Sequence, residues 1–360
     1  MTKNDNRMRW IRNLEKLATT SHRYSVEYEI GSECRIPGLL DYSNGEIICA
    51  AIYRPSSSDG LTLYNLVLQF PSEPPQQNPN ADAKGYYFKD GIVGELLALM
   101  SLFYRCRFYL MSSRVPPRDP RRSATLKSEH LPVRVRCETA VHPPLFESGN
   151  KNLAVGFADF LDAIRGTDSN LHQRFILACY HYARAVKEVG VDPEMVFIRL
   201  VSAIEVLCER MRLGEKEDVL DESRVAALIA GSGLSPEEKR ELKVVFDVRK
   251  SKKRFVRFVE QHCTGFIRGG NFRAQHLKIK RKDLPTVLNT VYNARSRYLH
   301  AGEPMFLSMT TTKQKWDIWP MLEMIVDNRK HSAAEALPYA HFFEGLVRHC
   351  LLKYLEVSGL

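Results

Sequence analysis

The feature that most limits how this chain can fold is an abrupt change of hydrophobic pattern near Gly149, after the stretch HPPLFESGNKN. Before this point, short runs alternate apolar and polar residues or are rich in β-branched and aromatic residues, as strands are. From Asn152 onward, apolar residues recur every three or four positions, as they do on the buried face of helices. The 360-residue chain therefore predicts an α+β protein, with a mixed α/β domain over residues 1–147 and an all-α helical bundle over residues 148–360.

The same patterns, together with turn and capping residues, locate individual elements. In the first domain we expect helices at 8–18 and 91–104, strands at 24–30, 46–53, 61–70 and 131–138, and a hairpin turn at 56–60. In the second domain we expect helices at 169–190, 192–213, 235–246, 283–302 and 338–356. Asp192 at a cap position followed by a proline begins one of these helices, and Ser235 with Glu238 forms a capping box at another. Gly214 and Gly302 are natural stops.

Positive charge is concentrated in one segment. Between Arg249 and Lys282 there are 12 Lys or Arg residues and one acid, so this segment has a net charge of +11. The whole chain has a net charge of +10, so the rest of the chain is nearly neutral. Focused positive charge of this kind indicates an anionic partner, with nucleic acid the first choice. The candidate contacts are Arg249, Lys250, Lys252, Lys253, Arg254, Arg257, Lys280, Arg281 and Lys282. The alternative interpretation is a solvated charged loop inserted between helices.

Aromatic residues are interleaved with these cations, at Phe255, Phe258, Phe266 and Phe272. Such a mixture suits stacking and phosphate contact with single-stranded nucleic acid. The equally good alternative is that Phe255, Phe258 and Val259 form an ordinary apolar helix face.

Several classes of protein lack support in the sequence. There is no phosphate-binding loop, no dinucleotide fingerprint, no HExxH and no GxSxG. The eight cysteines are dispersed, which favours neither a metal site nor a disulfide framework and fits a reducing cytoplasm. No apolar run reaches the roughly 18 residues of a membrane-spanning helix. We therefore expect a cytoplasmic protein with no metal and no cofactor, and with no membrane partner.

The helix at 283–302 contains an arginine where an apolar residue is expected. Its apolar stripe runs through Leu288, Val291, Tyr292 and Leu299, and Arg295 lies within it. A guanidinium in that position needs compensation, either from a partner surface or from a carboxylate such as Glu205. His300 near the helix end can act in proton transfer. Alternatively, it can simply stabilise the helix, because a cation interacts favourably with the negative end of the helix dipole.

Chemically, arginine and histidine suit the cleavage of RNA without a metal. Histidine titrates near neutral pH and can move protons, while arginine stays charged and binds phosphate oxygens. A separation of five residues places Arg295 and His300 about 140° apart around the helix. One helix is therefore a poor site, whereas two copies facing each other could make a good one.

The stretch YNARSRYLHAG resembles the RxxxxH signature of the HEPN superfamily, specifically its Apea-like branch. FIRLVSAIEVLCE resembles the other recognisable helix of that branch, with Glu205 as its central glutamate. The resemblance covers roughly residues 150–360. It implies a HEPN-like bundle and a metal-independent ribonuclease that acts as a symmetric homodimer in prokaryotic toxin or phage-defence systems.

The same resemblance assigns roles to particular residues. Arg295 and His300 match the catalytic pair, and Glu205, Ser296 and Arg297 are supporting residues. Ser296 is a departure, because many active members carry Asn, Asp or His directly after the arginine. RNA is the expected substrate, and the first domain is expected to sense a trigger or to restrain the nuclease through a partner or ligand. The alternatives are a catalytically inactive HEPN-like dimer that binds nucleic acid or a partner protein, and a purely structural dimeric adaptor.

Overall fold

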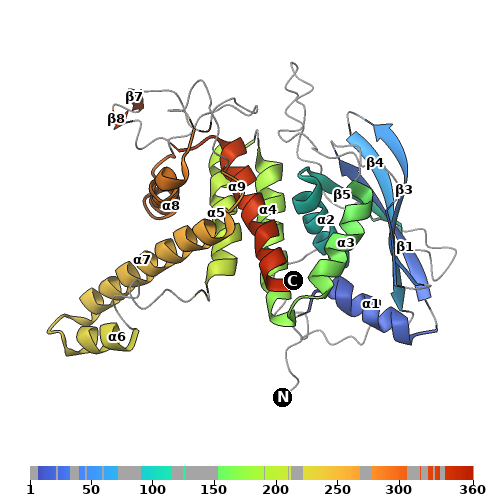
Figure 1. The fold of residues 1–360 in the computed structure, drawn as a ribbon, viewed down its shortest axis with the longest axis horizontal. Coiled ribbons are helices and arrows are strands. Elements are labelled where there is room, and N and C mark those ends of the chain that lie inside the picture. The colour runs from blue at the N-terminus through green and yellow to red at the C-terminus, as the bar shows by residue number, and fades with distance from the viewer. Residues whose placement is uncertain are drawn as a thin grey trace. The chain divides into compact units, whose positions relative to one another are not determined.

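The chain folds into two compact units of different architecture (Figure 1). Unit 1 comprises Met1–Gly190 with Thr311–Lys313 and Leu355–Leu360, and unit 2 comprises Val191–Thr310 with Gln314–Tyr354. The computed structural model describes residues 7–21, 23–32, 40–44, 47–58, 61–71, 91–114, 125–126, 153–189, 191–209, 211, 222–267, 278–305, 317, 323–326, 329–332 and 337–359. The α+β fold class expected from the sequence is confirmed.

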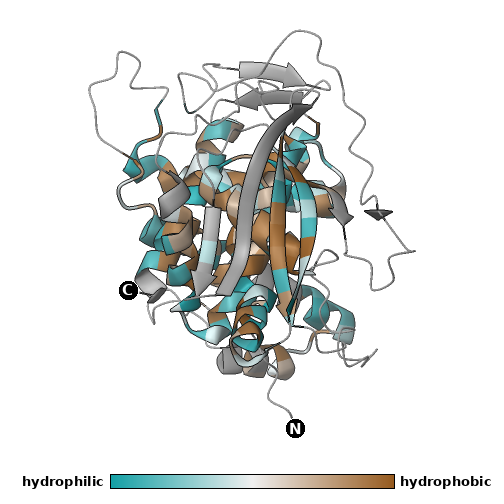
Figure 2. Cartoon of the chain, turned by 90° about the vertical axis from the view of Figure 1, so that its right-hand side faces the viewer, coloured by the Kyte–Doolittle hydropathy of each residue, from teal (hydrophilic) through white to brown (hydrophobic). Residues whose placement is uncertain are grey.

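A six-stranded antiparallel sheet forms the centre of unit 1. Its strand order is β2-β3-β4-β1-β5-β6. The strands are β1 (Arg23–Ser32), β2 (Leu40–Asn44), β3 (Ile47–Ser58), β4 (Leu61–Pro71), β5 (Phe108–Arg114) and β6 (Thr125–Leu126). In β1, Val26 is buried between the exposed Ser25 and Glu27, and the last three residues, Ile30 to Ser32, are all buried. In Figure 2, the coloured strands of the sheet carry both hydrophobic and hydrophilic residues.

Helices cover the sheet of unit 1. They are α1 (Arg9–Thr19), α2 (Gly91–Tyr104), α3 (Leu153–Arg165) and α4 (Ser169–Glu188). Figure 1 shows α2 and α3 on one face of the sheet, and α4 packs against α2. The ring of Phe103 in α2 contacts Phe157 and Phe160 in α3, each at a centroid distance of 5.3 Å. This aromatic contact joins α3 to the sheet unit.

The division between the units therefore differs from the predicted domains. The sequence placed the change near Gly149, because helical patterns begin there. In the structure, α3 and α4 belong to unit 1, and the compact units divide the chain after Gly190. Apolar faces that look alike in sequence pack against different partners, and the pattern alone does not say which.

Unit 2 is largely helical. Its helices are α5 (Pro193–Cys208), α6 (Glu222–Gly231), α7 (Pro236–His262), the short 3₁₀ helix η2 (Arg281–Asp283), α8 (Leu284–Ala301) and most of α9 (Ala340–Gly359). Its core includes Phe197 and Phe343, whose rings stack at 5.2 Å. In Figure 1, α6 and the first part of α7 extend away from α5 and α8.

The helices predicted in unit 2 are confirmed, but one helix end and the segments between the helices differ from the prediction. A hairpin of β7 (Glu323–Val326) and β8 (Arg329–Ser332) makes the expectation of an all-α bundle wrong. α5 ends at Cys208, before the predicted stop at Gly214. The first part of the basic segment, Arg249 to His262, is the continuation of α7, so it is no inserted loop. The strand expected at 131–138 lies outside the described residues.

Candidate functional site

Helix α8 carries the residues that the sequence singled out, and its ends follow local rules. A proline lies in its first turn, where the missing N–H costs nothing. Gly302 ends it with a φ of 67°, a left-handed conformation that favours glycine, and donates its N–H to the Tyr298 carbonyl at 3.1 Å. Leu288, Val291 and Ala294 are buried. This packing fixes which side of α8 faces the protein.

Arg295 lies in the middle of that buried side and is paired within its own chain. Its Nη2 donates to Glu205 Oε2 at 2.8 Å, from α8 to α5. The side chains of Arg295 and Glu205 are 20% and 21% exposed, so the pair is largely withdrawn from water. The sequence allowed two explanations for an arginine on the apolar stripe, a partner surface or a carboxylate. In the structure the compensating group is the carboxylate of Glu205. A second copy of the chain is therefore not needed to neutralise Arg295.

Glu205 has a second donor. Tyr292, one turn before Arg295 on α8, donates its hydroxyl to Glu205 Oε1 at 2.8 Å. Burial, with the nearby charge of Glu205, raises the pKa of Tyr292, so the phenol keeps its proton at neutral pH. This hydroxyl is the site feature that sequence reasoning missed, because Tyr292 was counted only as part of the apolar stripe. The spacing of three residues between Tyr292 and Arg295 places both side chains on one face of the helix, and it could have indicated that they share a partner.

Helices α5 and α8 run antiparallel, and a second contact shows where the end of α8 lies. The backbone N–H of Met305, just past α8, donates to Glu194 Oε1 in the first turn of α5 at 2.7 Å. The carboxylate of Glu194 beside Tyr298 raises the pKa of that phenol. The last turn of α8 thus lies beside the start of α5, whereas Glu205 and Arg295 meet near the end of α5.

His300 lies on the exposed side of α8. Within the described residues its imidazole has no hydrogen-bond partner. Asn293 lies three residues before Ser296 and four before Arg297, and His300 lies four and three residues after them, so these residues share one face of the helix. We call these four residues the outer face of α8. Arg295 points to the opposite side. Within one chain, therefore, Arg295 and His300 do not converge.

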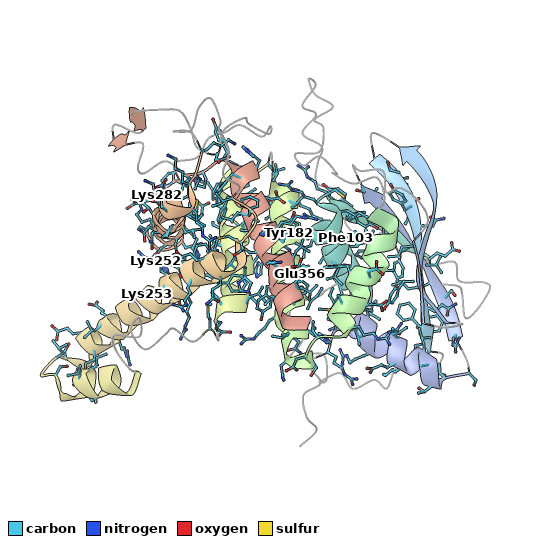
Figure 3. All side chains as sticks on the ribbon, in the orientation of Figure 1. Phe103, Tyr182, Lys252, Lys253, Lys282 and Glu356 are labelled. Atoms are coloured by element: carbon cyan, nitrogen blue, oxygen red, sulfur yellow. The ribbon has the colours of Figure 1, made fainter. Side chains whose placement is uncertain are left out.

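The cations of the basic segment have different surroundings. Lys252 of α7 donates to Asn293 Oδ1 at 3.2 Å, which connects α7 to the outer face of α8. Lys253 is exposed, while Arg254 and Arg257 are half-buried. Lys280, Arg281 and Lys282 are all exposed in and beside η2. Figure 3 shows Lys252 and Lys253 on α7 and Lys282 at the start of α8.

Other residues of the basic segment have structural roles, and some have side chains that the structure does not describe. Lys278 forms an ion pair with Asp317 at 2.8 Å, so it helps to hold the chain before η2. The side chains of Arg249 and Lys250 are outside the described residues. Phe255, Phe258 and Val259 are buried, which confirms the interpretation of an ordinary apolar helix face. The phenylalanines at 255 and 258 are thus not available for stacking on bases.

Arg297 forms only a long, exposed ion pair. Its Nη1 lies 3.8 Å from Glu303 Oε2, and both side chains are 46% exposed. Exposed pairs of this kind contribute little to stability. Arg297 therefore remains able to contact an anion on the outer face of α8.

Cys208 lies close to the Glu205 pair but is a poor nucleophile. Burial, with the charge of Glu205, raises the pKa of its thiol to about 12. The thiolate is the reactive form of cysteine, and at neutral pH it is scarcely populated here. Across the described segments, no three His, Cys, Asp or Glu side chains gather in an arrangement that could hold a metal ion. Nor does any helix in those segments combine the length and apolar character required to cross a membrane.

Comparison with known proteins finds no matching family model, and neither curated proteins nor solved structures give a match.

Proposed function

We propose that this chain is a metal-independent endoribonuclease of the prokaryotic toxin or phage-defence type. In this proposal the helices of unit 2 form a HEPN-like domain, and Arg295 and His300 form the active site at a homodimer interface. The observation that carries the proposal is the different environment of these two side chains on helix α8. Arg295 is held in place by Glu205, and His300 is exposed with no hydrogen-bond partner among the described residues.

Each group suits one part of the reaction. Cleavage requires removal of a proton from the 2′-hydroxyl, attack of that oxygen on phosphorus, and protonation of the departing 5′-oxygen. His300 is the proton-transfer group in this proposal, because histidine is the side chain that most often acts as a general acid or base. Arg295 supplies positive charge for the phosphorane, and Glu205 accepts only one of its five N–H donors. The products are a 2′,3′-cyclic phosphate and a 5′-hydroxyl.

The support for a homodimer comes from the geometry of α8 rather than from the charge of Arg295. Since Arg295 and His300 point to different sides of one helix, a common site needs Arg295 of one copy and His300 of another. Leu299 supports an interface at this end of the helix, because it is 47% exposed although it belongs to the apolar stripe. Homodimers are the commonest symmetric assemblies, and they bring identical helices face to face.

RNA is the expected ligand of the cations around this site. Lys280, Arg281 and Lys282 are exposed, Lys252 contacts the outer face of α8, and Arg297 and Ser296 lie on that face. Together they would contact phosphates leading to the cleavage site. For unit 1 we propose a regulatory role, exercised by binding a ligand or partner, as the resemblance to effector nucleases implies.

A cleavage assay on a mixed RNA tests the proposal. Wild-type protein should cut equally well with and without EDTA and leave a 2′,3′-cyclic phosphate. His300→Ala should abolish cleavage, whereas Arg297→Ala, which removes an exposed charge from the same face, should weaken RNA binding and retain cleavage. Loss of cleavage in EDTA with recovery in magnesium would rule out the mechanism.

One observation favours a second candidate, an inactive HEPN-like dimer that only binds nucleic acid. Glu205 already neutralises Arg295, so the arginine could be purely structural. The same assay separates the two functions. Salt-dependent RNA binding without any cleavage, unchanged by His300→Ala, would support the binding protein.

A further inference from the structure

Glu205 is the meeting point of two side chains from α8, and both of its carboxylate oxygens are used. Oε1 accepts the Tyr292 hydroxyl and Oε2 accepts Arg295 Nη2, each at 2.8 Å. A carboxylate with two fixed donors has little freedom to rotate. The position of the Arg295 guanidinium is therefore tied to Tyr292 through Glu205.

Tyr292 is itself held by packing on its other side. Its ring lies 5.5 Å from that of Phe255 in α7, measured between centroids. The guanidinium carbon of Arg295 lies 5.7 Å from the centre of the Tyr292 ring. Tyr292 thus meets Arg295 twice, directly through its ring and indirectly through Glu205.

The ring and the hydroxyl of Tyr292 can be assigned separate roles. Packing against Phe255 needs only the ring, and a core residue there could be phenylalanine. The hydroxyl adds a charge-assisted hydrogen bond whose only use in the described residues is to hold Glu205. A buried hydroxyl that holds a carboxylate in place is expected where that carboxylate in turn orients a functional group, which here is the guanidinium of Arg295.

We infer that Tyr292 and Glu205 are positioning residues that fix the Arg295 guanidinium in the orientation in which it meets an RNA phosphate. The inference rests on the proposed nuclease function. It adds that Tyr292 acts through its hydroxyl and through Glu205, without touching the substrate. A displacement of about 1 Å in a group that binds the reacting phosphate is enough to lower a rate strongly.

Tyr292→Phe is the test variant, because it removes the hydroxyl and keeps the ring. Tyr298→Phe is the matched control, with the same change six residues later on α8. In protein labelled on arginine, the Nε–H signal of Arg295 can be assigned by its absence in Arg295→Lys, and burial of that nitrogen slows its exchange. Tyr292→Phe should shift or broaden this signal, and Tyr298→Phe should leave it unchanged.

Single-turnover cleavage gives the second readout. Tyr292→Phe should lower the cleavage rate about tenfold, comparable to the loss of one charge-assisted hydrogen bond, with RNA affinity unchanged. In a Glu205→Gln background the hydroxyl should have no further effect. A Tyr292→Phe rate and Arg295 signal that both match wild type would overturn the inference, and so would a full tenfold loss in the Glu205→Gln background.

The two readouts separate this inference from the proposed function. If wild-type protein cuts no RNA, the nuclease proposal fails, and the Arg295 signal alone decides whether the hydroxyl positions the guanidinium. If wild-type protein cuts RNA while Tyr292→Phe changes neither signal nor rate, only the positioning role fails.

Discussion

Glu95 makes the stability of unit 1 depend on pH in an unusual direction. This carboxylate on α2 is 2% exposed and accepts the backbone N–H groups of Arg9 and Trp10, each at 3.0 Å, at the start of α1. Burial raises its pKa from 4.5 to about 7, although those two hydrogen bonds favour the charged form. Folded protein therefore holds a proton on Glu95 at pH values where the unfolded chain has released it.

The sign and size of the effect follow from that difference. The contribution of Glu95 to stability is fully present below pH 4.5 and is lost as the pH rises through about 7. The change corresponds to about 3 kcal/mol in the free energy of unfolding. Acid denaturation usually has the opposite sign, because ordinary paired carboxylates stabilise a protein as the pH rises.

Glu95→Gln isolates this contribution, because the amide does not titrate while all other groups remain. Its loss of one acceptor oxygen lowers stability by an amount that does not depend on pH. Urea unfolding should be followed by the fluorescence of Trp10, in a background with Trp316→Phe and Trp319→Phe so that Trp10 alone reports. The stability advantage of wild type over Glu95→Gln should fall by about 3 kcal/mol between pH 4.5 and 8.5. An advantage that stays constant or grows over this range would refute the reasoning.

Further predictions concern a helix cap, a helix end and the cations. Asp192→Ala removes the acceptor at the start of α5 and should lower the free energy of unfolding by about 1 kcal/mol in urea titrations; no loss would mean that the cap contributes nothing. Arg107→Met removes two hydrogen bonds to carbonyls at the end of α4 and should cost about 2 kcal/mol by the same measurement; an unchanged midpoint would contradict this. Replacing Lys280, Arg281 and Lys282 with glutamine should flatten the log–log salt dependence of RNA affinity by up to about 2, with the fold intact. An unchanged slope would place the RNA path elsewhere.

Local chemistry explains which structural predictions succeeded. Asp192, the Ser235–Glu238 capping box and Gly302 each act within a few residues, and all three have the predicted role in the structure. The sequence did not reveal α6 or the β7–β8 hairpin, because neither has a long periodic pattern. It also assigned α3 and α4 to the helical domain, because periodicity identifies an apolar face without identifying what covers it.

The candidate site illustrates the same limit. Glu205 and Arg295 are 90 residues apart, and their pairing was one of two interpretations that the spacing allowed. Only the antiparallel packing of α5 and α8 decides between them. The exposure of His300, by contrast, follows from its position about 140° around the helix from the buried arginine.

Mixing two inactive variants tests the composite active site most directly. Arg295→Ala and His300→Ala should each abolish RNA cleavage when assayed alone. If Arg295 of one copy works with His300 of another, a mixed dimer retains one intact site, and an equal mixture should recover about a quarter of wild-type activity. Exchange of chains should be verified by mass measurement of differently tagged copies. If mixed dimers form and cleavage stays at the level of the single variants, Arg295 and His300 do not form an active site across two copies of this chain.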